Sequence, residues 1–84
     1  MKMHMFAVQD VQAQAFMQPM FCQSQGVAIR MIADEVNRPA QDNVLYQHPE
    51  DFRLFSLGSW DNESGAFDLA PQPVLVVDAS ALKR

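Results

Sequence analysis

Between residues 24 and 37 the apolar positions recur at the spacing of an α-helix. The apolar side chains of this stretch are Ala28, Ile29, Ile32, Ala33 and Val36. Their spacing places them along one face of a helix with 3.6 residues per turn. Ser24 supplies an N-cap oxygen, Asn37 suits a left-handed C-terminal cap, and Pro39 prevents continuation. The pattern predicts a helix over about 24–37.

The apolar stretches before this helix have the form of β-strands. Residues 3–8 are apolar on both faces, with Met3 and Met5 on one face and Phe6 and Val8 on the other, as in a central or interface strand. Residues 16–23 contain a proline that disfavours a helix. We therefore expect 16–23 to form a second strand, at an edge of the sheet.

The second half of the chain has the pattern of a β-hairpin. Residues 52–60 are rich in aromatic and aliphatic side chains, and residues 61–65 (Asp-Asn-Glu-Ser-Gly) supply a turn in which Gly65 takes a positive φ. The returning strand begins near Ala66, is interrupted by two prolines, and ends in a β-prone segment at 74–77. Simple alternation along the first strand places Trp60 on the face of Phe52 and Leu54, with Arg53 and Phe55 on the other face.

These elements predict an α+β fold in which one helix, about 24–37, packs on a small antiparallel sheet of three to five strands. Residues 1–84 are expected to form a single domain. A polar loop at 38–50 is anchored by Val44, Leu45 and Tyr46, and residues 79–84 form a flexible tail or a brief helical turn.

The length of the chain limits the size of its hydrophobic core. A chain of 84 residues buries only roughly 60–65% of the surface that its unfolded form exposes, so its core is thin. Residues of both strand faces are apolar. We therefore expect a homo-oligomer, formed through a strand edge or through the second apolar strand face.

Charge argues against a protein that packages nucleic acid. The net charge is −4, with only six Lys and Arg residues, whereas tight packaging needs many cations to neutralise phosphates. Any binding to single-stranded DNA is expected to be weak, salt-sensitive and dependent on Arg30, Arg38 and Arg53. Phe55 and Trp60 are the candidates for base stacking. A core-plus-oligomer explanation of the aromatic residues needs no ligand, and we favour it.

The residues with catalytic or metal-binding chemistry do not form a recognisable motif. His4, His48 and Cys22 lack the spacing of a zinc site, and a lone cysteine in an apolar strand is typical of a core position. The adjacent carboxylates Asp34–Glu35 and Glu50–Asp51 suit a helix end and a turn, and residues 61–65 lack the ligand pattern of a calcium loop. We expect a protein that is not an enzyme, with no catalytic residue, metal or cofactor.

The compartment is indicated by cysteine usage and by the lack of targeting segments. One cysteine excludes an internal disulfide and suits a reducing cytoplasm. The N-terminal segment has no apolar run long enough for a signal peptide, and no segment approaches the ~18 apolar residues of a membrane span. We expect no membrane contact.

The sequence from residue 48 to residue 67 also resembles a known family. His48-Pro49-Glu50-Asp51-Phe52 is followed by Leu54-Phe55, Leu57-Gly58, Trp60-Asp61, Ser64-Gly65 and Phe67. Upstream, Val8-Gln9-Asp10, Phe16, Pro19-Met20-Phe21, Ala28-Ile29-Arg30 and Asn37 follow the same pattern. In these positions, residues 3–68 best, the chain resembles the small nonstructural protein of gokushovirus-type microviruses, which are phages with single-stranded DNA genomes.

The resemblance implies a role in viral DNA replication or in its coupling to packaging, within the cytoplasm of a host bacterium, and some members are labelled DNA-binding. It supplies no catalytic residue. Two function classes stay open: a replication accessory that binds the viral replication initiator, host proteins or single-stranded DNA, and an assembly or scaffolding protein that contacts coat protein. A basic stripe of Arg30, Arg38 and Arg53 favours the first class. Its absence, together with a large exposed apolar patch, favours the second.

Overall fold

The computed structural model describes residues 1–84 as a five-stranded sheet with one main helix. The elements in chain order are β1 (Lys2–Asp10), β2 (Ala15–Phe16), β3 (Met20–Cys22), α1 (Gln25–Val36), α2 (Val44–Gln47), the 3₁₀ helix η1 (Pro49–Asp51), β4 (Phe52–Asp61), β5 (Phe67–Asp78) and the 3₁₀ helix η2 (Ala79–Leu82). The predicted α+β class and the antiparallel sheet are confirmed.

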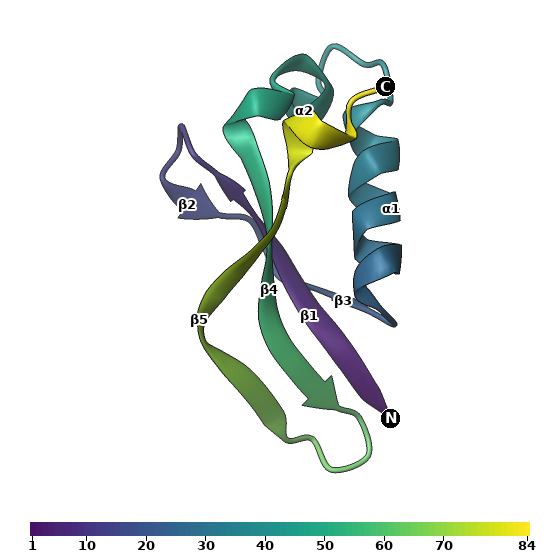
Figure 1. Ribbon diagram of the computed structural model, residues 1–84, viewed down its shortest axis with the longest axis vertical. Helices are drawn as coiled ribbons and strands as arrows, with labels where there is room; N and C mark the ends of the chain where they lie inside the picture. The colour runs from purple at the N-terminus through teal and green to yellow at the C-terminus, as the bar shows by residue number, and fades with distance from the viewer.

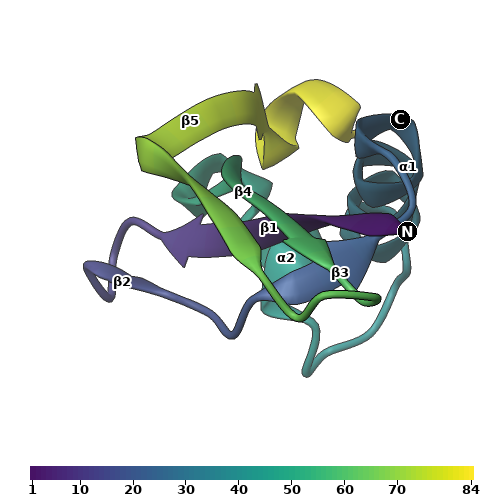
Figure 2. The same cartoon turned by 90° about the horizontal axis from the view of Figure 1, so that it is seen from below.

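β4 lies at the centre of the sheet, with β1 on one side and β5 on the other, all antiparallel. β2 and β3 both pair with the second edge of β1. Figure 1 shows α1 along one side of the strands and the β4–β5 hairpin extending past it, and Figure 2 shows the β2 turn on the other side. The molecule is elongated, about 41 × 23 × 20 Å.

The prediction of one strand over 16–23 is wrong. β2 and β3 are separate strands, and residues 17–19 lie outside both. Pro19 has no N–H to donate and restricts the residue before it, so it ends the pairing that a continuous strand requires. The amide of Met17 still donates to the carbonyl of Val8 at 2.7 Å, which holds the interrupted segment against β1.

The two ends of α1 differ in how well the sequence predicts them. Ser24 Oγ accepts a hydrogen bond from the Val27 amide at 3.2 Å, as an N-cap does. Asn37 was expected to adopt a left-handed conformation, but its φ is −102°, so that prediction is wrong. Its side-chain amide instead donates to the carbonyl oxygens of Ala33 at 2.7 Å and Leu82 at 3.0 Å, and thereby satisfies orphan acceptors.

The loop between α1 and β4 is organised by Asn43, which is only 5% exposed. Its Oδ1 accepts hydrogen bonds from the amides of Leu45 and Tyr46, so it caps α2. Its Nδ2 donates to the carbonyls of Glu35 at 2.8 Å and Arg38 at 3.0 Å. One buried amide therefore joins the end of α1 to the start of α2. Of the three anchors predicted for this loop, Leu45 is buried and Tyr46 is half-buried, but Val44 is 49% exposed, so the prediction is wrong for Val44.

The C-terminal residues adopt the helical-turn alternative. Ala79 is buried, and the Lys83 ammonium donates to the carbonyl of Val36 and lies 3.8 Å from the centre of the Tyr46 ring. A cation at a helix C-terminus interacts favourably with the helix dipole. Residues 79–83 thus pack against the C-terminal end of α1 and against α2.

The core lies between α1 and the face of the sheet that α1 covers. Its buried members are Phe6, Val8, Cys22, Ala28, Ile32, Val36, Leu45, Phe52, Leu54 and Ala79. Of the predicted apolar face of the helix, Ala28, Ile32 and Val36 are buried in the core and Ile29 packs at its margin, whereas Ala33 is half-buried and lies outside the cluster. Only 13 of the 84 residues are buried, so the core is thin, as the chain length suggested.

Candidate binding face

The face of the sheet opposite α1 carries a second set of apolar side chains. In antiparallel sheets directly paired residues point to the same side. Phe6 and Val8 belong to the core beneath α1, so Met3, Met5 and Ala7 point the other way. We call this second set the uncovered face: Met3, Met5, Ala7, Phe16, Phe21, Phe55, Trp60, Phe67, Leu69 and Leu75.

The position of Trp60 corrects the sequence analysis. Simple alternation placed Trp60 with Phe52 and Leu54, but Trp60 pairs with Met3. The register between β1 and β4 shifts at Leu57, where the backbone accommodates one extra residue, and Gly58 has φ +132°. A β-bulge of this kind inverts the alternation beyond it. Trp60 therefore joins Phe55 on the uncovered face.

Three rows of paired residues cross the uncovered face. The first contains Ala7, Phe55 and Leu75; the second contains Phe21, Met5, Gly58 and Leu69; the third contains Met3, Trp60 and Phe67. The aromatic members are in contact. The ring centres lie 5.3 Å apart for Phe16 and Phe55, 5.6 Å for Phe21 and Trp60, and 6.4 Å for Trp60 and Phe67. The Phe16–Phe55 pair has the edge-to-face arrangement that aromatic pairs prefer.

The outer members of this face are strongly exposed. Phe16, Phe21, Phe67, Leu69 and Leu75 are each between 44% and 62% exposed, whereas Met5 and Ala7 beneath them are buried. Contiguous exposed apolar surface of this kind marks an interaction site in a soluble protein more often than an isolated exposed leucine does.

The structure does not bring the three candidate arginines together. Arg30 lies in α1, and Arg38 follows its C-terminal end. Arg53 lies in the sheet, where it pairs with Gln9 and points to the uncovered face. Arg38 forms a 2.6 Å ion pair with Glu35, and Arg53 forms a 3.2 Å ion pair with Asp78. The hydrogen bond from Arg38 lowers the pKa of the Glu35 carboxyl. No basic stripe is formed.

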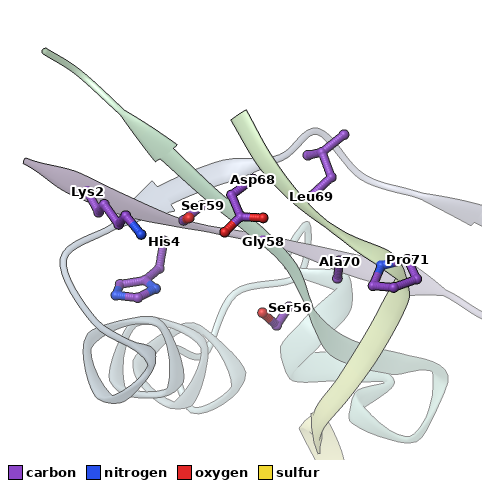
Figure 3. Close-up of a pocket in the computed structure, with 9 residues that line it drawn as sticks. All are labelled: Lys2, His4, Ser56, Gly58, Ser59, Asp68, Leu69, Ala70 and Pro71. Atoms are coloured by element: carbon purple, nitrogen blue, oxygen red, sulfur yellow. The ribbon is translucent and has the colours of Figure 1, made fainter. Parts of the chain in front are cut away.

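A polar hollow lies on the helix side of the sheet, where β5 separates from β4. Its volume is about 440 Å³, and it is lined by Lys2, His4, Ser56, Ser59, Asp68 and nearby backbone. Figure 3 shows Lys2 and His4 on one side of the strands, with Leu69 pointing away from them. The hollow is open and mixes a cation with a carboxylate, so it has no single ligand preference.

Two other groups considered from the sequence have structural explanations. His48, Glu50 and Asp51 place one ligand atom each within 4.8 Å of one another, but they are solvated residues of the η1 turn, and Asp51 accepts a hydrogen bond from Gln12. Cys22 is buried in the core, and burial raises the pKa of its thiol. A thiol in that state is a poor nucleophile.

Comparison with known proteins identifies the family. The model of the family described as phage ORF5 protein matches residues 3–82, which is nearly the whole chain. The chain therefore belongs to the phage ORF5 protein family. No curated protein and no solved structure matches it. None of its helices is long and apolar enough to cross a membrane.

Proposed function

We propose that this member of the phage ORF5 family is a non-enzymatic, assembly-type protein that works through protein–protein contacts made by its uncovered face. The observation that carries the proposal is the composition of that face: three apolar rows whose only flanking arginine is neutralised by Asp78. Apolar, uncharged surfaces of this kind suit protein partners. The resemblance to the gokushovirus-type protein supports a role where synthesis of single-stranded genomes meets packaging.

A replication accessory that binds single-stranded DNA is the second candidate, because Phe55 and Trp60 now share one face. Base stacking on exposed rings contributes about 1–3 kcal/mol per base. Attraction to phosphates is weak here, since the chain carries a net charge of −4 and Arg53 is paired. One arginine allows a log–log salt slope of only about −0.7. Binding of a protein partner is therefore preferred over binding of single-stranded DNA as the proposed function of this face.

The test compares two lysine substitutions in a phage that carries this gene. Leu75→Lys places a charge on the uncovered face, and Met31→Lys places one on α1, outside that face, at a side chain that is 48% exposed against 50% for Leu75. We expect Leu75→Lys to reduce the yield of filled particles at least tenfold while duplex replicative DNA accumulates normally. Met31→Lys should leave both unchanged.

The outcomes separate the candidate functions. If Leu75→Lys abolishes single-strand synthesis itself, the replication role replaces the assembly role. The purified protein should then bind a fluorescent single-stranded oligonucleotide in titrations at low and moderate salt, and a Trp60→Ala variant should lose this binding. A normal particle yield from Leu75→Lys would contradict a binding role for the uncovered face altogether.

A further inference from the structure

The occupant of the uncovered face can be argued from its area, its charge and the state of the neighbouring sheet edges. Resting on the proposed function, in which this face is a binding surface, we infer that its partner is a second copy of the chain, packed face to face as a two-fold symmetric dimer.

Area is the first argument. A large aromatic side chain offers about 150–250 Å², so the five half-exposed outer side chains leave on the order of 400–600 Å² of apolar surface open. Specific interfaces bury about 800 Å² per partner, a little over half of it apolar. The uncovered face therefore supplies the apolar area that one side of a standard dimer interface needs.

Charge is the second argument. Each chain carries −4, so two copies repel one another unless they meet on a neutral surface. The uncovered face is such a surface, because Arg53 and Asp78 compensate one another at its end. A polyanion gains nothing from this face beyond stacking, whereas an identical neutral apolar face loses its contact with water.

The sheet edges supply the third argument, because they exclude the alternative mode of self-association. The sheet has two open edges. At β5, Pro71 and Pro73 lack the N–H groups that a new strand would need. At the opposite edge, β2 and β3 are only two and three residues long and are separated by Pro19. The register between β4 and β5 also shifts beside Val76 and again between Ser56 and Gly58. Prolines and bulges protect an edge from pairing. Two copies are left with sheet-on-sheet packing, in which apolar faces stack about 10 Å apart with nearly aligned strands.

The only tryptophan of the chain gives a direct readout, since Trp60 lies in the third row of the face. Sedimentation equilibrium of the full chain should show twice the 9.5 kDa monomer mass at about 100 µM. Dilution to about 1 µM should shift the Trp60 emission to the red as the ring becomes exposed. Sodium sulfate at about 0.5 M should strengthen the dimer, because it favours apolar burial.

Leu69→Lys should weaken the dimer at least tenfold, and Leu75→Lys, on another row, should do the same. Met31→Lys is the matched control and should dimerise as the parent does. Circular dichroism verifies folding, which half-exposed positions should tolerate. A monomeric parent at about 300 µM, a trimer or larger ring, or a dimer that survives both face substitutions would overturn the inference. If the parent is monomeric while Leu75→Lys still lowers particle yield, only the identity of the partner is wrong and the proposed function stands.

Discussion

The two faces of the sheet carry similar side chains in opposite surroundings. On the helix side, Phe6 and Leu54 are 1% exposed, and the ends of the covering helix are closed by Ser24, Asn37 and Asn43. On the uncovered side, Phe67 is 58% exposed and Leu75 is 50% exposed. Because apolar side chains stabilise a fold only to the extent that they leave water, stability is concentrated on the helix side and binding capacity on the other.

The largest effect is expected from a charge inside the helix-side core. Ile32→Asp places an unpaired carboxylate among buried apolar side chains and should cost about 4–5 kcal/mol, enough to unfold a small domain. Met31→Asp, one residue away and half exposed, should cost less than about 1 kcal/mol. Urea unfolding followed by circular dichroism checks both. Equal midpoints for the two variants would show that the helix faces are assigned wrongly.

Leucine truncations on neighbouring strands compare the faces directly. Leu54→Ala should cost about 2–5 kcal/mol, because Leu54 is fully buried beneath α1. Leu75→Ala should cost less than about 1 kcal/mol when measured at a protein concentration low enough to favour monomer. Similar losses for the two variants would indicate that the uncovered face also holds the monomer together, and the comparison of the faces would fail.

Gly58 controls which side chains reach the uncovered face. A Cβ at this position would lie 2.3 Å from the Asp68 carbonyl oxygen and 2.8 Å from Leu69 Cα, with φ at +132°. Gly58→Ala should therefore cost about 2–4 kcal/mol and change the Trp60 emission as β4 shifts. Gly26→Ala, on α1, where an added Cβ would make only an ordinary contact with Ser24 Oγ at 3.9 Å, should instead stabilise by about 0.5–1 kcal/mol. Thermal unfolding measures both, and an unchanged Gly58→Ala variant would contradict the bulge.

Asn43→Ala tests the hydrogen bonds that join the end of α1 to the start of α2. The substitution removes the cap of α2 and leaves the carbonyls of Glu35 and Arg38 without their side-chain partner, so we expect a loss of about 1–3 kcal/mol. Gln47→Ala removes one exposed hydrogen bond to Ala40 and should cost less than about 0.5 kcal/mol. The urea concentration at the midpoint of unfolding measures both losses. Equal midpoints for Asn43→Ala and Gln47→Ala would show that Asn43 does not stabilise the fold more than an exposed glutamine does.

The smallest effect belongs to the exposed ion pair at the end of α1. The Arg38 hydrogen bond lowers the pKa of Glu35 in the folded state. The stabilisation is therefore present above the unfolded-state pKa of about 4.3 and is lost as the pH falls through the folded-state pKa. Solvent screens the pair, so Glu35→Gln should cost only about 0.3–0.5 kcal/mol at pH ~6 and nothing at pH ~2. A cost that persists at the lower pH would mean that the side chain stabilises by packing.

Local patterns in the sequence were sufficient for most of the fold. The period of the apolar residues located α1, Ser24 located its start, and the Asp-Asn-Glu-Ser-Gly turn located the β4–β5 hairpin. Each of these signals acts over a few neighbouring residues, where backbone sterics and hydrogen bonding decide the outcome. The continuous strand at 16–23 and the left-handed Asn37 were wrong because competing local effects, a missing N–H and a side-chain hydrogen bond, prevailed.

The sequence by itself determined that apolar residues lie on both sides of the strands, and it named Phe55 and Trp60 as candidates. Only the tertiary structure decided that these two share a face, because a bulge at Leu57 and Gly58 inverts the alternation. It also decided that Arg53 is paired with Asp78, that Arg30 and Arg38 lie on the other layer, and that Asn43 joins two helices. Register, ion pairing and buried caps depend on residues far apart in the chain, and a periodic pattern carries no information on which distant strand a residue will meet.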